Sequence, residues 1–244
     1  MIRVLVPVPS PPPERLRVRG ERFHHLVHVL RIKPGETVEV FDGSGQAFSA
    51  RVVSVDEVSV ELVLGESREE RPQRRIAIVQ GLPKGEKLEW IIEKATELGA
   101  AEILPVSTAR AVVRLEGDRA AKRLARWRRI AEEAARQCGR ADVPHVLAPR
   151  PLASVFEVLP PDATVLILDE IERTRRLSQA AREASLGAPL AVVAGPEGGL
   201  ERGEVAALAA RGAIPVSLGL NVLRTETAAL AALSVLRHLD GHLG

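Results

Sequence analysis

A regular alternation of apolar strands and amphipathic helices, which begins near residue 75, constrains the fold of this chain more than any other feature. Five short apolar segments have the length and content of buried strands, and they cover residues 75–81, 101–107, 163–170, 189–195 and 213–220. Each is followed by apolar residues at helical spacing, within 86–99, 118–139, 175–187, 200–212 and the tail from Thr225. Helices that link parallel strands cover both faces of their sheet. The sequence therefore predicts an α/β domain with a mostly parallel sheet.

The residues before this domain have a different pattern. Short valine-rich segments that largely alternate in polarity lie at 2–8, 37–41, 48–55 and 58–64, with one amphipathic segment at 21–32. Such alternation is typical of half-buried antiparallel strands, so we expect a small β-barrel with a single helix. The charged segment "GESREERPQRR", residues 65–75, is predicted to be a linker, which gives domains at 1–72 and 73–244.

Composition limits the cellular setting and the partners. Hydrophobic residues make up 45% of the 244 residues, but no apolar run has the length of a membrane helix. The N-terminus does not resemble a signal peptide, and a single cysteine, Cys138, excludes an internal disulfide. We therefore expect a cytoplasmic protein with no membrane partner.

Basic residues are concentrated between positions 110 and 140. Ten of them stand there against four acids, and the ten are Arg110, Arg114, Arg119, Lys122, Arg123, Arg126, Arg128, Arg129, Arg136 and Arg140. A dense arginine surface favours a phosphate-rich partner such as RNA. The alternative is a solvated helix face with no partner.

Three loops after predicted strands hold the clearest signs of a ligand site. They read "LDEIERT", "GPEGGLERGE" and "GLNVLRTET", and each follows a strand at the carboxyl edge of the sheet, where open parallel sheets bind ligands. Glycines permit close approach of a ligand to the backbone. The chain has no G-x-x-x-x-G-K-[ST] motif, and no G-x-G-x-x-G follows a strand, so the usual nucleotide motifs are absent.

The segments "LAVVAGPEGGLERGE" and "VSLGLNVLRTETAAL" resemble the RsmE family of SPOUT methyltransferases. "FHHLVHVLRIKPGE", "LPKGEKLEWIIEKATELGAAEILPVSTAR" and "EEAARQCGRADVPHV" are similar to further parts of that family in the same order. The resemblance implies a PUA-like β-barrel, a SPOUT domain with a C-terminal trefoil knot, and a homodimer. It also implies methylation, by S-adenosylmethionine, of N3 of a uridine in 16S ribosomal RNA of the small subunit.

The resemblance also places the residues of the site. The cofactor is expected in the three loops, held by Leu168, Asp169, Ala194, Gly195, Pro196, Glu197, Gly199, Leu218, Gly219, Leu220, Asn221, Val222, Leu223 and Thr225. RNA is expected to contact Lys84, Lys94, Arg110, Arg119, Arg123 and Arg126. Thr225 is also a candidate N-cap of the last helix, with Glu226 in its first turn.

Methylation of a ring nitrogen requires the loss of its proton, which a nearby cation favours. The candidates are Arg136, Arg140 and Arg224, with Glu226, or Glu197, as a possible base. Transfer to nitrogen needs no cysteine nucleophile, so Cys138 is expected to be a packing residue. The histidines of "HHLVH" lack further zinc ligands nearby, so no metal is predicted.

Two other functions are compatible with the residues alone. The chain could be an RNA-binding protein without catalytic activity, which docks on ribosomal RNA. It could also be an α/β enzyme that holds a phosphate ligand on the amides of "GPEGG".

Overall fold

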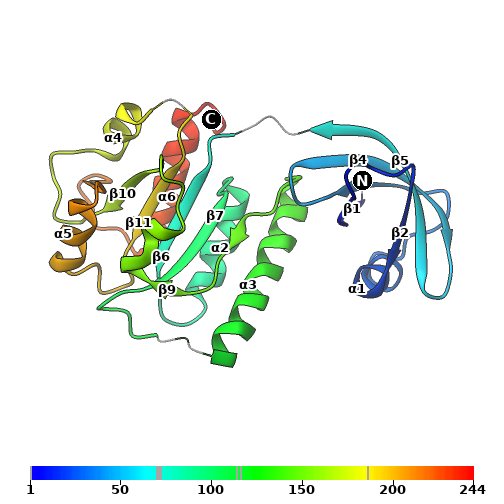
Figure 1. Cartoon of the computed structure of the whole chain (residues 1–244), viewed down its shortest axis with the longest axis horizontal. Coiled ribbons are helices and arrows are strands. Elements are labelled where there is room, and N and C mark those ends of the chain that lie inside the picture. The colour runs from blue at the N-terminus through cyan, green and yellow to red at the C-terminus, as the bar shows by residue number, and fades with distance from the viewer. Residues whose placement is uncertain (1, 70–72, 114, 116, 186) are drawn as a thin grey trace. The chain divides into compact units, whose positions relative to one another are not determined.

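The computed structural model describes residues 2–69, 73–113, 115, 117–185 and 187–244. The chain divides into two compact units, one made of Met1–Pro72 with Ala135–Val143 and the other of Gln73–Ala134 with Pro144–Gly244. Figure 1 shows the course of the chain through both. The assignment of 1–72 and 73–244 as functional domains stays a prediction.

The N-terminal unit is built on a five-stranded sheet with the order β1-β3-β4-β5-β2. Its strands are β1 (Ile2–Leu5), β2 (Arg15–Arg19), β3 (Thr37–Phe41), β4 (Gln46–Val55) and β5 (Ser59–Glu69). All neighbouring pairs are antiparallel except β1 with β3. The alternating valines of these strands form one buried core, which includes Val38, Val40, Val60 and Leu62. No pairing between β1 and β2 closes this sheet within the described residues.

Two details of this unit differ from the sequence-based expectation. The segment expected as one helix at 21–32 is α1 (Gly20–His24) followed by the π-helical turn η1 (His25–Val29). The predicted linker begins too early, because β5 continues to Glu69 and pairs there with Gln46. Residues 70–72 of that linker, like Arg114 of the basic segment, lie outside the described residues.

The C-terminal unit contains the predicted parallel sheet. Its order is β12-β10-β11-β6-β7-β8, with β9 also paired to β7, and every pair is parallel. The strands are β6 (Ile76–Gly81), β7 (Glu102–Ser107), β8 (His145–Val146), β9 (Arg150–Pro151), β10 (Thr164–Leu168), β11 (Leu190–Ala194) and β12 (Ile214–Val216). The five predicted strands are confirmed. The two-residue strands β8 and β9 are additions.

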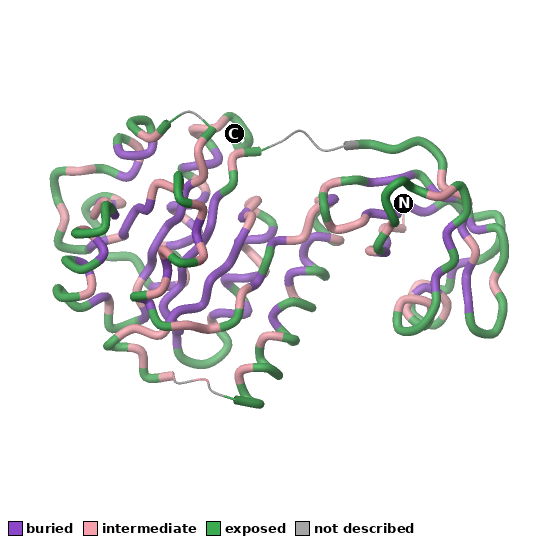
Figure 2. Tube along the Cα trace, in the orientation of Figure 1, coloured by how far each residue is buried: buried purple, intermediate pink, exposed green. Residues whose placement is uncertain are grey.

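Helices cover both faces of this sheet (Figures 1 and 2). They are α2 (Lys87–Glu97), α3 (Gly117–Cys138), the 3-10 helix η2 (Leu152–Glu157), α4 (Leu177–Glu183), α5 (Arg202–Ala210) and α6 (Thr225–Leu239). Val79 and Val193 pack into one core with residues of η2 and α5. Ile78 and Val192 point to the opposite face and are also fully buried, and helices α2 and α4 each pack against α6. Burial on both faces explains why these strands are continuous apolar runs.

Two segments of the C-terminal unit run side by side in parallel around Arg176 and Ser217. Ser217 N–H donates to the Arg175 carbonyl over 2.8 Å, and Leu177 N–H donates to the Ser217 carbonyl over 3.0 Å. The chain before α4 therefore lies against the chain that leads to α6. The trefoil knot stays a prediction from the resemblance.

Candidate functional site

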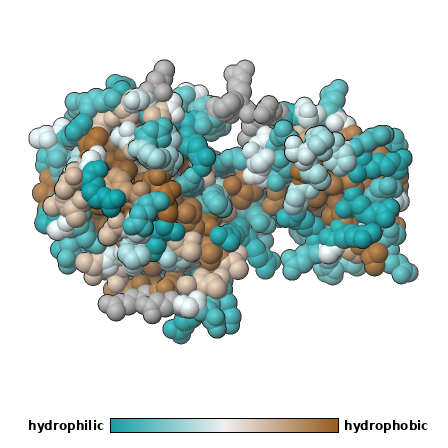
Figure 3. Space-filling view, in the orientation of Figure 1, coloured by the Kyte–Doolittle hydropathy of each residue, from teal (hydrophilic) through white to brown (hydrophobic). Residues whose placement is uncertain are grey.

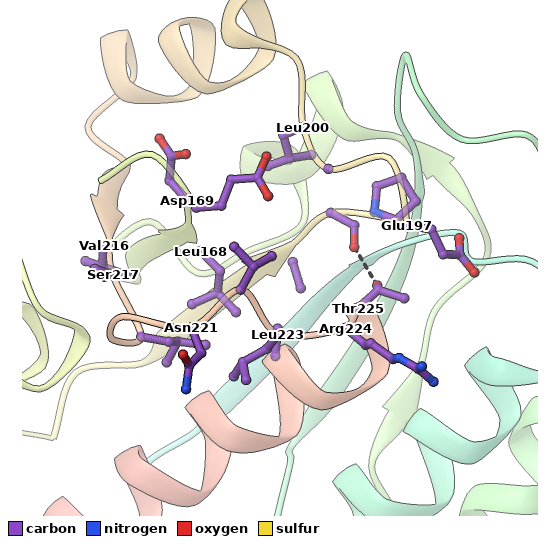
Figure 4. Close-up of a pocket in the computed structure, with 18 of the residues that line it drawn as sticks. Leu168, Asp169, Glu197, Leu200, Val216, Ser217, Asn221, Leu223, Arg224 and Thr225 are labelled. Atoms are coloured by element: carbon purple, nitrogen blue, oxygen red, sulfur yellow. Dashed lines mark hydrogen bonds between the residues drawn. The ribbon is translucent and has the colours of Figure 1, made fainter. Parts of the chain in front are cut away.

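A cavity of about 330 Å³ lies where β10, β11 and β12 end, and its walls are the three loops singled out in the sequence (Figure 4). We call it the loop cavity. The predicted cofactor residues that line it are Leu168, Asp169, Ala194, Gly195, Pro196, Glu197, Gly199, Leu218, Gly219, Asn221, Val222, Leu223 and Thr225. The carboxyl ends of three parallel strands thus bring together residues that are distant in sequence.

Leu220 is the predicted cofactor residue that the loop cavity excludes. Its side chain is 92% exposed, and it lies instead at a second hollow with Arg176 and Val235. Leu220 therefore does not line the loop cavity, and its role in cofactor binding stays a prediction. Several other residues that line the loop cavity were not predicted from the sequence. They are Lys87, Glu170, Arg173, Leu200, Arg202, Val216, Ser217 and Ala228.

Close backbone packing fixes the "GPEGG" loop. A Cβ atom on Gly195 would lie 2.9 Å from the Gly199 carbonyl carbon and 3.0 Å from the Leu200 nitrogen. A Cβ atom on Gly81, at the end of β6, would lie 2.6 Å from Pro196 Cδ. Such distances leave no room for a side chain, so glycine is required at both positions because of close approach.

A buried amide links this loop to the start of α6. Gln80 is fully buried, and its Nε2 donates to the Gly195 carbonyl (3.2 Å) and to Thr225 Oγ1 (2.9 Å). Thr225 Oγ1 in turn donates to the Gly195 carbonyl over 2.6 Å, the bond drawn in Figure 4. The expected N-cap role of Thr225 is wrong. Arg224 is the N-cap residue, and the Thr225 hydroxyl is used to hold the loop.

One end of the loop cavity carries an ion pair. Both carboxylate oxygens of Asp169 accept hydrogen bonds from Arg202, each over 2.8 Å, and the Ile171 N–H donates to the same carboxylate. The Asp169 side chain is 5% exposed and that of Arg202 is 50% exposed. The hydrogen bonds from Arg202 lower the pKa of Asp169, and the same contact raises the pKa of Arg202. Asp169 is therefore held as a carboxylate at neutral pH.

The other end carries a lysine between two glutamates. Lys87 Nζ lies 3.0 Å from Glu197 Oε1 and 3.4 Å from Glu226 Oε2. Glu197 raises the pKa of Lys87. Partial burial acts to raise the pKa of Glu197, but its hydrogen bonds and the charge of Lys87 outweigh this and lower it. Lys87 is thus a fixed cation, and Glu226 is confirmed in the first turn of α6.

The predicted catalytic residues separate into two groups. Arg224 and Glu226 line the loop cavity, and Figure 4 shows Arg224 and Glu197 on the side away from Asp169. Arg136 and Arg140 belong to the other unit and do not line the cavity. There, Arg136 Nη1 lies 2.7 Å from His25 Nε2, and Arg140 binds Asp142 over 2.6 Å.

The exposed basic residues Arg119, Lys122, Arg123, Arg126, Arg128 and Arg129 form what we call the α3 basic surface. Arg123 and Arg126 pair with Glu89 of α2, at 3.6 and 2.6 Å. For Arg119, Lys122 and Arg129, no ion pair is found in the described part of the chain. Some residues of the α3 basic surface therefore hold α2 to α3, and the charges of the others face solvent.

The other residues predicted to contact RNA form hydrogen bonds within the protein. Lys94 binds Glu93 (2.7 Å) and Glu97 (2.8 Å), and these carboxylates raise its pKa well above the usual value. Arg110 Nη1 donates to the Gly198 carbonyl over 2.9 Å. Lys84 is exposed, and its backbone N–H donates to Glu197.

Cys138 is exposed, so the expectation of a packing cysteine is wrong. Among the residues that the structure describes, no helix is both long and apolar enough to cross a membrane. No cluster of three potential metal ligands occurs among the same residues.

Two family models match the chain. A model described as an RNA methyltransferase domain matches residues 69–237, and one described as an RNA methyltransferase PUA domain matches residues 18–65. Together they cover most of both units.

Named relatives cover nearly the whole chain. A Bacillus subtilis (strain 168) protein named Ribosomal RNA small subunit methyltransferase E is 37% identical over 91% of this chain and 89% of its own length. A Mycobacterium bovis protein of the same name is 39% identical over 88% of this chain and 83% of its own length. A crystal structure of a protein of that name from Neisseria gonorrhoeae, bound to S-adenosyl methionine, is similar with a TM-score of 0.85, 34% identity and 98% coverage of both chains.

Proposed function

Because the chain belongs to the ribosomal RNA small subunit methyltransferase E family, we propose that its loop cavity holds S-adenosylmethionine and that the acceptor is N3 of a uridine in 16S ribosomal RNA. The chain is an RNA methyltransferase with a SPOUT domain and a PUA domain. The observation that carries the proposal is the convergence of three separate loops on one cavity. A relative that is 34% identical along its length binds the same cofactor.

The residues present fit this cofactor. The cavity has the size of a small-molecule site, and apolar side chains such as Leu168, Val216 and Leu223 alternate in its wall with the backbone groups of glycines. The apolar surface suits an adenine ring. The carboxylates of Asp169 and Glu197 suit the hydroxyl and ammonium groups of the cofactor.

When bound, S-adenosylmethionine supplies a methyl group on a positively charged sulfur. The protein must align the acceptor nitrogen with that methyl group and help it lose its proton. Arg224 lies at the cavity, and its charge would favour the anionic form of the uracil ring. We propose Glu226, which follows Arg224 closely in the chain and lines the same cavity, as the carboxylate that takes the N3 proton.

Ribosomal RNA is larger than the cavity, so other surfaces must bind it. The PUA-domain match and the α3 basic surface support contacts with RNA in both units. We propose that the substrate RNA lies within the small ribosomal subunit. A cytoplasmic location is consistent with this role.

We also propose a homodimer. The apolar residues of α6 do not provide the interface, because Leu230, Leu233 and Leu236 are buried in the core of the unit. The support comes from apolar side chains that stay at the surface, chiefly Leu220 and Val222. Figure 3 shows hydrophobic residues among the hydrophilic ones on the face of the molecule in view. Light scattering at micromolar concentration tests this, and a 26 kDa species alone would contradict it.

The two alternatives are less well supported. An RNA-binding protein without activity does not need a cavity beside its RNA surface. A phosphate enzyme at "GPEGG" does not explain the apolar wall formed by Leu168 and Leu223.

The decisive experiment is methylation of small ribosomal subunits with isotopically labelled S-adenosylmethionine, followed by mass mapping of the 16S RNA. We expect one labelled uridine whose added methyl group is on N3. Label on another base or on a ribose would contradict the assignment of the acceptor. Calorimetry with the cofactor alone tests the cavity separately, and no binding there would contradict the enzyme.

A further inference from the structure

The chain has only six aromatic side chains of the Phe, Trp and Tyr types, and Trp90 is the exposed one. Its side chain is 46% exposed, whereas Trp127 is 2% exposed. A single exposed apolar residue is ordinary in itself. The residues around Trp90 indicate a more specific role for it.

Trp90 lies on the outer face of α2, between charged residues one turn away on either side. Glu86 and Lys87 precede it, and Glu93 and Lys94 follow it, so each faces the same side of the helix. Each of these charges has an ionic partner. The surroundings of the indole are therefore close to neutral, and its ring is available to a flat ligand.

The partners of these charges locate Trp90 on the surface of the C-terminal unit. Lys87 joins α2 to the loop cavity through Glu197 and Glu226. Glu86, one residue earlier, joins α2 to α3 through Arg126, at 3.7 Å. Figure 1 shows α2 and α3 side by side. Trp90 therefore lies between the loop cavity and the α3 basic surface.

An RNA whose target base enters the loop cavity and whose phosphates lie on the α3 basic surface must pass this position. A base moved out of its stack loses its stacking energy, and aromatic side chains commonly replace it. We propose that Trp90 stacks against a base of the substrate RNA next to the methylated uridine. The proposal rests on the proposed function and adds a binding residue to it.

The test uses the full-length protein and a fluorescein-labelled single-stranded oligo-uridine of about ten nucleotides. Trp90→Ala is expected to weaken its binding by between about 5-fold and 100-fold, the value of one base–aromatic stack. Trp90→Phe keeps a ring and is expected to bind within about twofold of wild type. The slope of affinity against salt should not change, because an indole releases no counterions.

Intrinsic fluorescence gives an independent measurement. RNA should quench the tryptophan emission of the wild-type protein, and the change should be lost in Trp90→Phe, which retains only Trp127. Unchanged RNA affinity in Trp90→Ala overturns the proposal, as does an emission that RNA leaves constant. An emission that shifts on dilution without RNA overturns it too, since Trp90 would then contact a second copy of the chain.

Methylation kinetics separate this proposal from the function on which it rests. With small ribosomal subunits, Trp90→Ala should raise the KM for RNA and leave the cofactor KM unchanged. If the wild-type protein transfers no methyl group to 16S RNA, the proposed function fails. If the wild type is active and Trp90→Ala has the same kcat/KM, only the role of Trp90 fails.

Discussion

The loop cavity and the α3 basic surface differ in the part of the protein that forms them. The cavity is built from backbone segments in close contact, where Gly81, Gly195 and Pro196 leave no room for further atoms. The α3 basic surface is built from exposed side chains, several of which have no ion pair within the described residues. Ligand binding in the cavity should therefore be lost abruptly when one atom is added to its wall, whereas RNA binding on the basic surface should weaken in steps as charges are removed.

The largest effect is expected from one methyl group in the cavity wall. Gly195→Ala places a Cβ atom against the backbone of Gly199 and Leu200, so the loop must move. We expect the affinity for S-adenosylmethionine, measured by calorimetry, to fall by about 100-fold, near the upper range for overpacking. Gly203→Ala is the matched control because a Cβ atom there meets open space. Equal affinities in a folded pair of variants would show that the loop is not rigid.

The second effect concerns the α3 basic surface. Replacing Arg119, Arg123 and Arg126 together would also remove the partners of Glu89, which has a side chain only 11% exposed. Alanine at Arg119, Lys122 and Arg129 is a cleaner change. We expect RNA affinity to fall about tenfold near 0.15 M salt, and the slope of log affinity against log salt to fall by about 2.

Lys94→Ala is the control for that experiment, because Glu93 and Glu97 already compensate its charge. It should leave the salt slope unchanged. A wild-type slope in the triple variant would mean that the α3 basic surface is a solvated helix face. A flattened slope in Lys94→Ala would mean that RNA displaces the intrahelical ion pairs.

The smallest effect concerns the ion pair of Asp169 and Arg202, one of the electrostatic contacts at the loop cavity. The pKa of Asp169 is lowered by Arg202, so its ion pair stabilises the folded protein above the unfolded pKa and is lost as pH falls through the lower folded pKa. Asp169→Asn should therefore cost about 1–2 kcal/mol of unfolding free energy at pH 7. In denaturant titrations this difference should shrink between about pH 5 and pH 3. The exposed Asp162→Asn is the control, and a difference independent of pH would assign the cost to packing.

Much of the fold could be predicted from the sequence, because strands buried on both faces are apolar runs. β6, β10 and β11 lie within the expected segments for this reason. β2 was missed because "RLRVR" alternates arginine with apolar residues and follows a proline-rich stretch. β8 and β9 are too short to have a pattern, and β5 extends through charged residues because its pairing with β4 continues.

The site residues that could be predicted from the sequence are those in the loops at the ends of strands. The glycine-rich loops follow apolar runs, so their convergence could be expected. Gln80 and Lys87 could not be found this way, because Gln80 lies within an apolar strand and Lys87 looks like an ordinary charge in a helix. Their roles depend on partners more than 100 residues later in the sequence. No local pattern contains that information.

The hydrogen bonds that join Gln80, Gly195 and Thr225 also determine when the cavity can form during synthesis of the chain. Thr225 begins the last helix, which ends at Leu239, five residues before the end of the chain. Contacts between such distant residues form only after the intervening chain has been made. During translation the first 200 residues can assemble most of the sheet, but the cavity lacks one wall until α6 has left the ribosome. We infer that the proposed site for the methyl donor is complete only once α6 has been made and has packed against the sheet, so cofactor binding comes after the folding of the C-terminal unit.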